Sequence, residues 1–402
     1  MRLGSSITAL FGACGAAAAR PFLHGVNDTS RCLRPPALFV EWGWVEQHIG
    51  ILSPRALYLE YRQASMTKEP PGHQPSDFDA LTLAMCNSLT VQQQRPSSLM
   101  PGLLEPWVGR FSGLVQVNVG NSCNQQCPHC SLDRDGLFRT TLEEAKGTLE
   151  AASELGLSGA TFVGGEPTIW PHLFASLTFM RKRRMERAVL NTNGLMLAYP
   201  RYLPRLEESG VGTVVCSLDH FEPHGQRLLA NREDTPELIT AAVDNLAVSP
   251  INTSFYTVCT KLLDGKLDKL GEFLLHTSDA FRNQPAVILA PLRHPNLDQS
   301  QFDSLAWRFS DLLREIQSPL EAMSRELPVF LKGFPLCLLG PLRAHAFEEH
   351  VSILAVDSQH GHPLPRRQQG EALERCALCP DVDTCPGIPP AYVRRFGPDE
   401  LR

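Results

Sequence analysis

Gly113-Leu-Val-Gln-Val-Asn-Val119 is followed almost at once by Asn121-Ser-Cys-Asn-Gln-Gln-Cys-Pro-His-Cys130. The first stretch is an apolar run and predicts a buried β-strand. The second stretch places Cys123, Cys127 and Cys130 in a CxxxCxxC spacing on a loop that leaves this strand. Three thiolates on so short a loop can converge on one metal centre, and thiolate is the soft ligand that iron–sulfur clusters select.

The number of thiols in this loop decides between kinds of metal site. A four-iron cluster normally takes four protein ligands, so three cysteines leave one iron open for another ligand. The alternatives are a structural zinc loop or three unrelated thiols. Zinc sites use CxxC pairs or Cys/His sets with a fourth ligand nearby, and His129 lies awkwardly for that role inside the motif. The spacing therefore favours an iron–sulfur cluster with one open position.

Composition limits the class of protein. The 402 residues allow two or three domains, and a hydrophobic content of 43% is that of a folded globular protein. A net charge of -6 and a pI near 6.1 give no sign of a nucleic acid or an anionic membrane as partner. No apolar run of about 18 residues predicts a membrane span. The 12 cysteines are too sparse for a disulfide scaffold, and their clustering favours metal binding in a reducing cytoplasm.

The N-terminal part reads differently from the rest. Residues 1–20 faintly imitate a signal peptide, but export would expose an oxygen-sensitive cluster, and an upstream extension from a misplaced start codon explains the stretch equally well. Residues 21–110 carry proline-broken pieces between short amphipathic runs such as residues 78–89. We therefore expect residues 1–110 to form an irregular lead-in or accessory region, and the sequence does not indicate its function.

From residue 113 the chain alternates between short apolar runs and amphipathic stretches. Strands are expected at residues 113–119, 159–163, 188–190, 212–217, 253–258 and 286–289. Helices are expected at residues 141–155, 171–185, 201–208, 235–248, 267–276 and 302–316. Six successive β-then-α units imply parallel strands with right-handed crossovers, and six are too few for an eight-stranded barrel. The prediction is an α/β fold with a partial (β/α)6 barrel over residues 111–320.

Polar turns follow three successive strands of this predicted barrel. They contain Gly164, Gly165, Glu166 and Pro167, then Thr192 and Asn193, then Ser217 and Asp219. Paired glycines let a ligand approach the backbone, the Glu166 carboxylate could meet an ammonium, and the third turn could hydrogen-bond a ribose. Any one of these is an ordinary turn motif. Three of them beside an open cluster loop predict a pocket for a molecule with an amino-acid end and a nucleoside end.

Together these motifs resemble the radical S-adenosylmethionine (radical SAM) superfamily, over roughly residues 113–290. The resemblance implies that Cys123, Cys127 and Cys130 hold a [4Fe–4S] cluster whose open iron chelates S-adenosylmethionine (SAM). It also implies that residues 164–167 accept the SAM amino group and that Ser217 lies near the ribose. His129 departs from the family pattern, which usually has an aromatic residue before the third cysteine. Its flat ring can still lie against adenine.

The activity that the resemblance implies is reductive. SAM would be cleaved to methionine and a 5′-deoxyadenosyl radical, which abstracts hydrogen from a substrate, with an electron donor such as flavodoxin or ferredoxin. We expect a ribosomally synthesised peptide as substrate. The alternative is a small metabolite such as a nucleoside, sugar or amino acid. A non-catalytic iron–sulfur protein is a third possibility, but it would not need a SAM pocket.

The last quarter of the chain, residues 321–402, carries a second set of cysteines. Its members are Cys337, Cys376, Cys379 and Cys385. Their spacing suits structural zinc and iron–sulfur about equally. The segment resembles the shortened, "twitch"-like relative of the SPASM extension of radical SAM enzymes, which implies a second, auxiliary [4Fe–4S] cluster.

Several other residues are weaker candidates. Arg293 and His294 follow the sixth strand and are possible substrate contacts, and His220 or His224 could move a proton, although capping and surface roles are the simpler expectation. Of the scattered cysteines, Cys216 and Cys259 lie in expected strands and are read as core residues. Cys14, Cys32 and Cys86 have no assigned role.

Overall fold

The computed structural model describes residues 102–130, 132, 138–293, 299–351, 353–354, 376, 378–382 and 384–401. The predicted accessory region up to residue 101, with its amphipathic run and Cys14, Cys32 and Cys86, lies outside the described residues, as does His294. Within the described part, one parallel sheet has the strand order β7-β6-β5-β4-β3-β2-β1-β8. Its strands are β1 Leu114–Asn118, β2 Gly159–Val163, β3 Arg187–Thr192, β4 Val211–Ser217, β5 Asn252–Cys259, β6 Ala286–Pro291, β7 Val329–Leu331 and β8 Ile353–Leu354.

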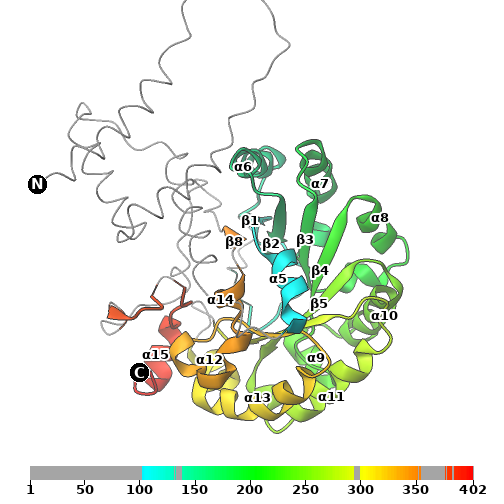
Figure 1. Ribbon diagram of the computed structural model, residues 1–402. Helices are drawn as coiled ribbons and strands as arrows, with labels where there is room; N and C mark the ends of the chain where they lie inside the picture. The colour runs from blue at the N-terminus through cyan, green and yellow to red at the C-terminus, as the bar shows by residue number, and fades with distance from the viewer. Residues whose placement is uncertain are drawn as a thin grey trace, which may run out of the picture. The chain divides into compact units, whose positions relative to one another are not determined.

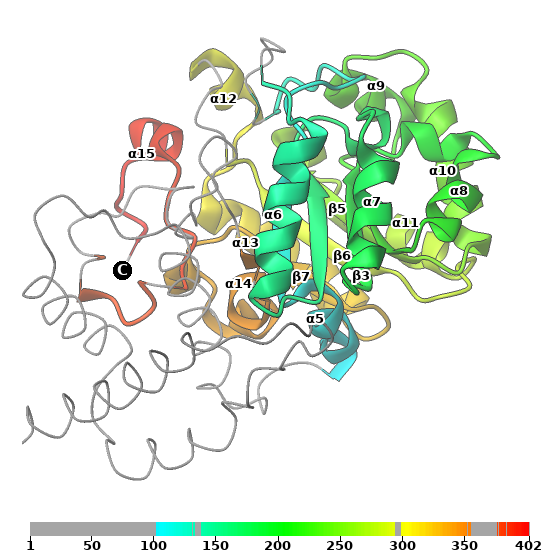
Figure 2. The same ribbon diagram turned by 90° about the horizontal axis from the view of Figure 1, so that it is seen from above.

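A layer of helices covers the outer face of the curved sheet (Figure 1). These helices are α6 Leu142–Glu154, α7 Leu173–Lys182, α8 Tyr202–Glu208, α10 Thr235–Val248, α11 Leu267–Ser278 and α13 Phe309–Met323. The six expected β-then-α units are all present, so the predicted partial barrel is confirmed. In the turned view α6 and α7 run side by side against the strands (Figure 2).

The sequence reasoning misplaced some elements. The helix expected at residues 302–316 is two helices, α12 Gln299–Leu305 and α13, because Arg308 adopts an extended conformation between them. The additional helix α9 Pro223–Ala230 follows β4. Strands β7 and β8 lie beyond residue 320, where the barrel was expected to end, and they extend the sheet by pairing with β6 and β1.

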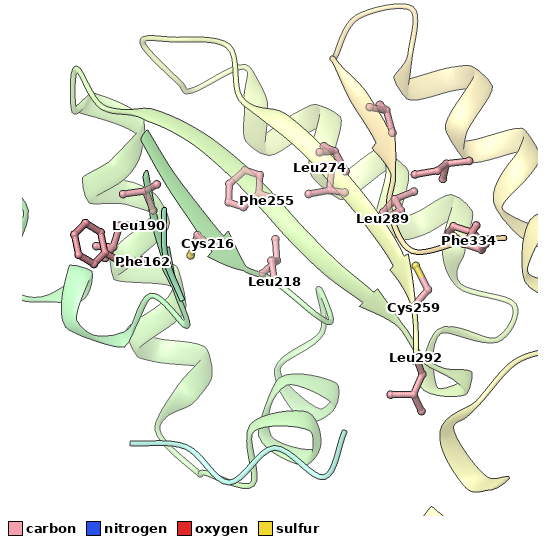
Figure 3. Close-up of a cluster of buried hydrophobic side chains, with 14 of the residues drawn as sticks. Phe162, Leu190, Cys216, Leu218, Phe255, Cys259, Leu274, Leu289, Leu292 and Phe334 are labelled. Carbon is pink, nitrogen blue, oxygen red and sulfur yellow. The ribbon is translucent and has the colours of Figure 1, made fainter. Parts of the chain in front are cut away.

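Alternation of side chains builds two separate cores. On β1, Val115 and Val117 point outward into the large cluster between the sheet and its helices, whereas Leu114 points into the barrel. Figure 3 shows the outer cluster, in which Phe162 and Phe255 are both fully buried. Cys216 and Cys259 belong to this cluster, as expected from their strand positions.

The interior of the barrel is apolar at its amino end. Helix α5 Glu105–Phe111 precedes β1 and packs Trp107 and Phe111 against the inward-facing Phe330 of β7. The Phe111 and Phe330 ring centroids are 6.2 Å apart, in an edge-to-face arrangement. Residues 105–111 are thus helical and part of the barrel, whereas an irregular segment was expected up to residue 110.

The end of the chain also packs on the barrel. Helix α15 Pro390–Phe396 places the Tyr392 ring in a stack on Phe309 of α13, with centroids 4.0 Å apart. The Tyr392 hydroxyl accepts a hydrogen bond from the Phe309 backbone N–H at 2.9 Å. Within the described residues, no helix has both the length and the apolar composition that a membrane crossing requires.

Replacement of Phe255 by Ala tests the outer core. Phe255 is fully buried and packs edge-on against Phe281, so the change leaves a cavity and should lower the free energy of unfolding by about 3–5 kcal/mol. Val248→Ala on α10 is the matched control, because that side chain is 75% exposed and its change should stay within about 0.5 kcal/mol. Denaturant unfolding measures both. Equal stability of the two variants would contradict the packing described.

Candidate metal and cofactor site

The cysteine loop leaves β1 at the carboxyl edge of the sheet and is held there by the turn after β2. The Gly165 N–H donates to the Gly120 carbonyl at 2.6 Å, and the Glu166 N–H donates to the Ser122 carbonyl at 2.8 Å. A side chain at Gly165 would put its Cβ 2.0 Å from the Ser122 oxygen, and Gly164 has a φ of +125°. Both glycines are therefore needed for the approach of two backbones, whereas we expected them to admit a ligand.

Glu166 joins three parts of the site. One carboxylate oxygen, Oε1, accepts hydrogen bonds from the Thr168 N–H, the Thr168 hydroxyl and the Thr192 hydroxyl, at 2.9, 2.5 and 2.7 Å. The other, Oε2, accepts from the Asn193 N–H at 2.7 Å. Burial raises the pKa of Glu166, and these hydrogen bonds oppose that rise. A carboxylate has about four acceptor positions, and these four hydrogen bonds make Glu166 a structural link. Its expected contact with an ammonium stays a prediction.

A pocket opens beside the cysteine loop. It lies between that loop, the ends of β3 and β4, and helices α9 and α10. Its lining residues are Gln125, Cys127, Asn193, Ser217, Leu218, Asp219, His220, Gln226, Leu229, Ala230, Thr235 and Ile239. Three predicted cofactor-binding residues, Asn193, Ser217 and Asp219, are thus brought together next to a predicted cluster ligand. Thr192 is buried and holds Glu166, and Pro167 begins a short 3-10 turn, Pro167–Ile169.

His129 connects the cysteine loop to β4. Its Nε2 lies 3.1 Å from Asp219 Oδ2, while Asp219 Oδ1 accepts from the Val258 N–H of β5 at 2.8 Å. The other ring nitrogen, Nδ1, is buried without a hydrogen-bond partner among the described residues. A buried nitrogen without a partner fits a bound group at this position. The sequence offered no sign of the pairing with Asp219, because the two residues are far apart in the chain.

Helix α9 and the residues after it also hold the loop. The Ala230 carbonyl accepts from the Gln126 N–H, and the Asn124 carbonyl accepts from the Arg232 guanidinium, both at 3.1 Å. Asn193 Nδ2 donates to Asn124 Oδ1 at 2.7 Å. The proline at the first position of α9, Pro223, is a helix-start signal that the sequence reasoning did not use.

Of the two histidines after β4, His220 lines the pocket and is also held by its neighbours, whereas His224 is not among the lining residues. His220 accepts from the Glu222 N–H at 3.0 Å, and its Nε2 lies 3.3 Å from the Leu262 carbonyl oxygen. A Cβ on Gly225 would lie 2.3 Å from the His220 ring, so the ring is tightly enclosed. His224 is exposed on α9. These positions agree with the simpler expectation of capping and surface roles.

The surroundings of Cys123 change the pKa of its thiol. Burial raises the pKa of Cys123, with the charges of Glu166 and Cys130 acting in the same direction and the Gln125 backbone opposing them. Soft thiols beside a pocket with polar walls fit an iron–sulfur cluster that holds a further ligand. Among the described residues, no three His, Cys, Asp or Glu side chains meet at metal-ligating distances. The joint ligation by Cys123, Cys127 and Cys130 is therefore a proposal.

Parts of the second cysteine set lie near one another. Burial raises the pKa of Cys385, hydrogen bonds with the Leu336 and Gly387 backbone oppose this, and Cys376 is near enough to raise it further. Leu336 directly precedes Cys337. The Cys379 N–H donates to the Cys376 carbonyl at 3.1 Å. Backbone N–H groups that face a sulfur stabilise a thiolate.

Two arginines fasten this C-terminal segment. Arg343 makes a two-pronged ion pair with Asp381, at 2.8 and 2.6 Å, and Asp381 lies between Cys379 and Cys385. The Arg293 guanidinium donates to the carbonyls of Gly333, Pro386 and Gly387, the last two at 2.8 and 3.2 Å. Arg293 is therefore engaged with the backbone, whereas a substrate contact was expected.

Residues 117–274 match the model of the Radical SAM superfamily. This matched region contains the cysteine loop and strands β2 to β5, so this part of the chain is similar to a radical SAM domain.

Curated relatives share this domain at low identity. The chain is 26% identical to a GTP 3′,8-cyclase of Petrotoga mobilis over 38% of this chain and 49% of that protein. It is 24% identical to molybdenum cofactor biosynthesis protein 1 of Bos taurus over 63% of this chain and 39% of that protein. The chain thus spans about half the length of these relatives, or less.

Two solved structures are matched with TM-scores below 0.5. Streptococcus suis SuiB bound to S-adenosylmethionine has a TM-score of 0.49 at 15% identity, over 73% of this chain and 76% of that one. The FeFe-hydrogenase maturase HydG of Carboxydothermus hydrogenoformans has a TM-score of 0.47 at 18% identity, over 78% of this chain and 72% of that one.

Glu166→Gln tests the structural link. The amide NH₂ would have to face either the Asn193 N–H or the donors on the other oxygen, so a buried donor loses its acceptor. We expect the free energy of unfolding to fall by about 1–3 kcal/mol, measured by chemical denaturation. Glu237→Gln is the control, because the Glu237 side chain is 66% exposed and its change should have little effect. An unaltered stability of Glu166→Gln would contradict the four hydrogen bonds.

Proposed function

We propose that the protein is a radical SAM enzyme that reductively cleaves SAM and abstracts hydrogen from a substrate. The observation that carries this proposal is the pocket in which Cys127 lies beside Asn193, Ser217 and Asp219, within a barrel that matches the superfamily model. A [4Fe–4S] cluster and SAM, when bound, would supply the one-electron cleavage. The cysteines, the polar strand ends and the barrel would bind, orient and shield the reacting groups.

The chain's own residues divide this work. Cys123, Cys127 and Cys130 are the proposed cluster ligands. The backbone of residues 164–167 runs along the cysteine loop, where the resemblance places the SAM amino group, and the buried Glu166 fixes Asn193 at the pocket wall. Ser217 and Asp219 offer oxygen acceptors for a ribose from the end of β4. His129 presents a flat ring that Asp219 orients.

The substrate has two candidates. A ribosomally synthesised peptide is the substrate expected from the sequence. A small metabolite is favoured by the curated relatives, whose names include GTP 3′,8-cyclase. Anaerobic incubation with SAM, dithionite and either GTP or a peptide encoded beside the gene, followed by mass spectrometry, separates these candidates. Reduced flavodoxin or ferredoxin is the proposed electron donor, and the cytoplasm, where thiols stay reduced, is the proposed compartment.

We also propose an auxiliary [4Fe–4S] cluster at Cys337, Cys376, Cys379 and Cys385, in a twitch-like extension after the barrel. The nearness of Cys376 to Cys385 and the backbone donors around Cys385 support it. The proposed domain organisation is an accessory region up to residue 110, a radical SAM core over 111–320 and this extension over 321–402. Helix α5 and strands β7 and β8 belong to the barrel although they lie in the flanking segments.

Cys127→Ala should abolish SAM cleavage, because the cluster would lose one of three ligands. The measurement is 5′-deoxyadenosine formed under reducing, anaerobic conditions, together with the absorbance of the reconstituted cluster. Cys259→Ala is the matched control, since that thiol is buried in the outer core and is not a proposed cluster ligand, and cleavage should persist. Retained cleavage in a folded Cys127→Ala protein would disprove the proposed function.

Metal analysis tests the auxiliary cluster. Two [4Fe–4S] clusters require about eight iron and eight sulfide per reconstituted chain. Arg343→Met removes the ion pair that holds Asp381 and should lower the iron content towards four while SAM cleavage continues at the barrel. Arg314→Met, at an exposed arginine of α13, should keep the full content. About four iron with one zinc in the unaltered protein would show a zinc site instead.

A further inference from the structure

Two polar side chains inside the barrel have no role in the site described above. Tyr256 is an inward-facing residue of β5 and packs against the interior cluster. Lys332 follows β7, and its N–H donates to the Leu289 carbonyl at 2.9 Å. Because Phe330 points inward and Leu331 outward, strand alternation directs Lys332 inward as well. Both residues therefore face the interior. Tyr256 lies level with Phe330 across the sheet, through Ile288, and Lys332 lies two residues further toward the carboxyl edge.

The surroundings of Lys332 are mainly aromatic. Its ammonium lies 5.5 Å from the centroid of the Tyr256 ring and 4.8 Å from that of Phe347. Burial lowers the pKa of Lys332, and the charge of Glu348 opposes this. Among the described residues, no hydrogen bond from the Lys332 ammonium or the Tyr256 hydroxyl is found, although both side chains are partly exposed. The donors of both groups are therefore open to a ligand that enters the barrel.

Lys332 is the group in this region that can attract an anion. Arg293 and Lys332 both lie near Glu348, and Asp219 is a second carboxylate, near Tyr256. Glu348 Oε1 accepts from the Gly333 N–H at 2.8 Å, and Arg293 is committed to backbone carbonyls. Lys332 is thus the cation in this group whose donors are available to a ligand.

The position of this pair relates it to the cofactor pocket. Tyr256 pairs in register with Ser217 of β4, and Ser217 and Asp219 line the pocket. Asp219 is near enough to raise the pKa of Tyr256. A molecule bound between Tyr256 and Lys332 would therefore lie one strand away from the pocket proposed for SAM.

We propose that Lys332 and Tyr256 form a substrate subsite that binds an oxyanion, the ammonium and the hydroxyl both donating to it. This inference rests on the proposed function, because it places the substrate inside the barrel beside SAM. The oxyanion is the phosphate of a nucleotide or the carboxylate of an organic acid. A lysine meets either as a compact charge, and the tyrosine hydroxyl adds one directed donor.

Calorimetric titration of the reconstituted, SAM-loaded protein with inorganic tripolyphosphate and, separately, with glutarate tests the subsite. The wild-type protein should bind one of these probes, and which one it binds identifies the source of the oxyanion. Lys332→Met should weaken that binding by about 10- to 100-fold, and Tyr256→Phe by about 3- to 10-fold, the ranges expected for a charged and a neutral hydrogen bond. Lys146→Met, on the exposed face of α6, should bind as the wild type does.

Two results would overturn the subsite. One is equal affinity in the wild type and in Lys332→Met, and the other is no binding of either probe by the wild type. If Lys332→Met does not fold, Lys332→Gln and the conservative Tyr256→Phe carry the test. Formation of 5′-deoxyadenosine by the wild-type protein is measured in parallel. Failure of that reaction counts against the proposed function, whereas cleavage without probe binding counts against the subsite alone.

Discussion

The close approach of two backbones, between the cysteine loop and the Gly164–Gly165 turn, is the constraint on which the rest of the site depends. Two hydrogen bonds continue the β1–β2 pairing beyond the ends of both strands, so the sheet itself fixes the register of the loop. Glu166, the next residue, is held by the same contact and positions Asn193, whose side chain reaches back to Asn124 in the loop. These hydrogen bonds join the loop, the Gly164–Gly165 turn and the residues after β3 in a ring, and none of them is made by a cysteine side chain.

Side chains other than the cysteines hold both cysteine segments in place, but the two segments use different kinds of interaction. At the first segment a buried carboxylate is stabilised by four donors from η4 Pro167–Ile169 and β3, which offsets the cost of removing its charge from water. At the second segment, arginines from the barrel side engage a carboxylate and backbone carbonyls. Such groups set the position and the electrostatic environment of a metal centre that the ligands alone would leave loosely defined.

Strand periodicity and turn residues predict the six repeating units and the edge of the sheet on which the site lies, because those signals are local. The rest depends on contacts between distant residues. Strand β7 is only three residues long and shows no alternation. The apolar run that contains β8 is typical of a strand, but nothing in it indicates that it pairs with β1. Helix α5 contains Pro106 and Gly109, two residue types with low helix propensity, so the sequence does not indicate a helix there. Its helical form depends on packing Trp107 and Phe111 into the barrel. Likewise, the donors to Glu166 from Thr192 and Asn193 and the carbonyls bound by Arg293 lie far from these two residues in the sequence.

The pairing of β8 with β1 has a consequence for how the chain reaches this structure. Strand β1 emerges early in synthesis, but the partner for its outer edge emerges much later, after every other strand of the sheet. Until then a row of unpaired backbone groups lies directly before the cysteine loop. Edges of this kind invite pairing with other chains, and late, non-local pairing is slow. Loading of the loop with iron and sulfide, as proposed, would therefore compete in time with aggregation at the adjacent edge, and the order of these two events would affect the yield of functional protein.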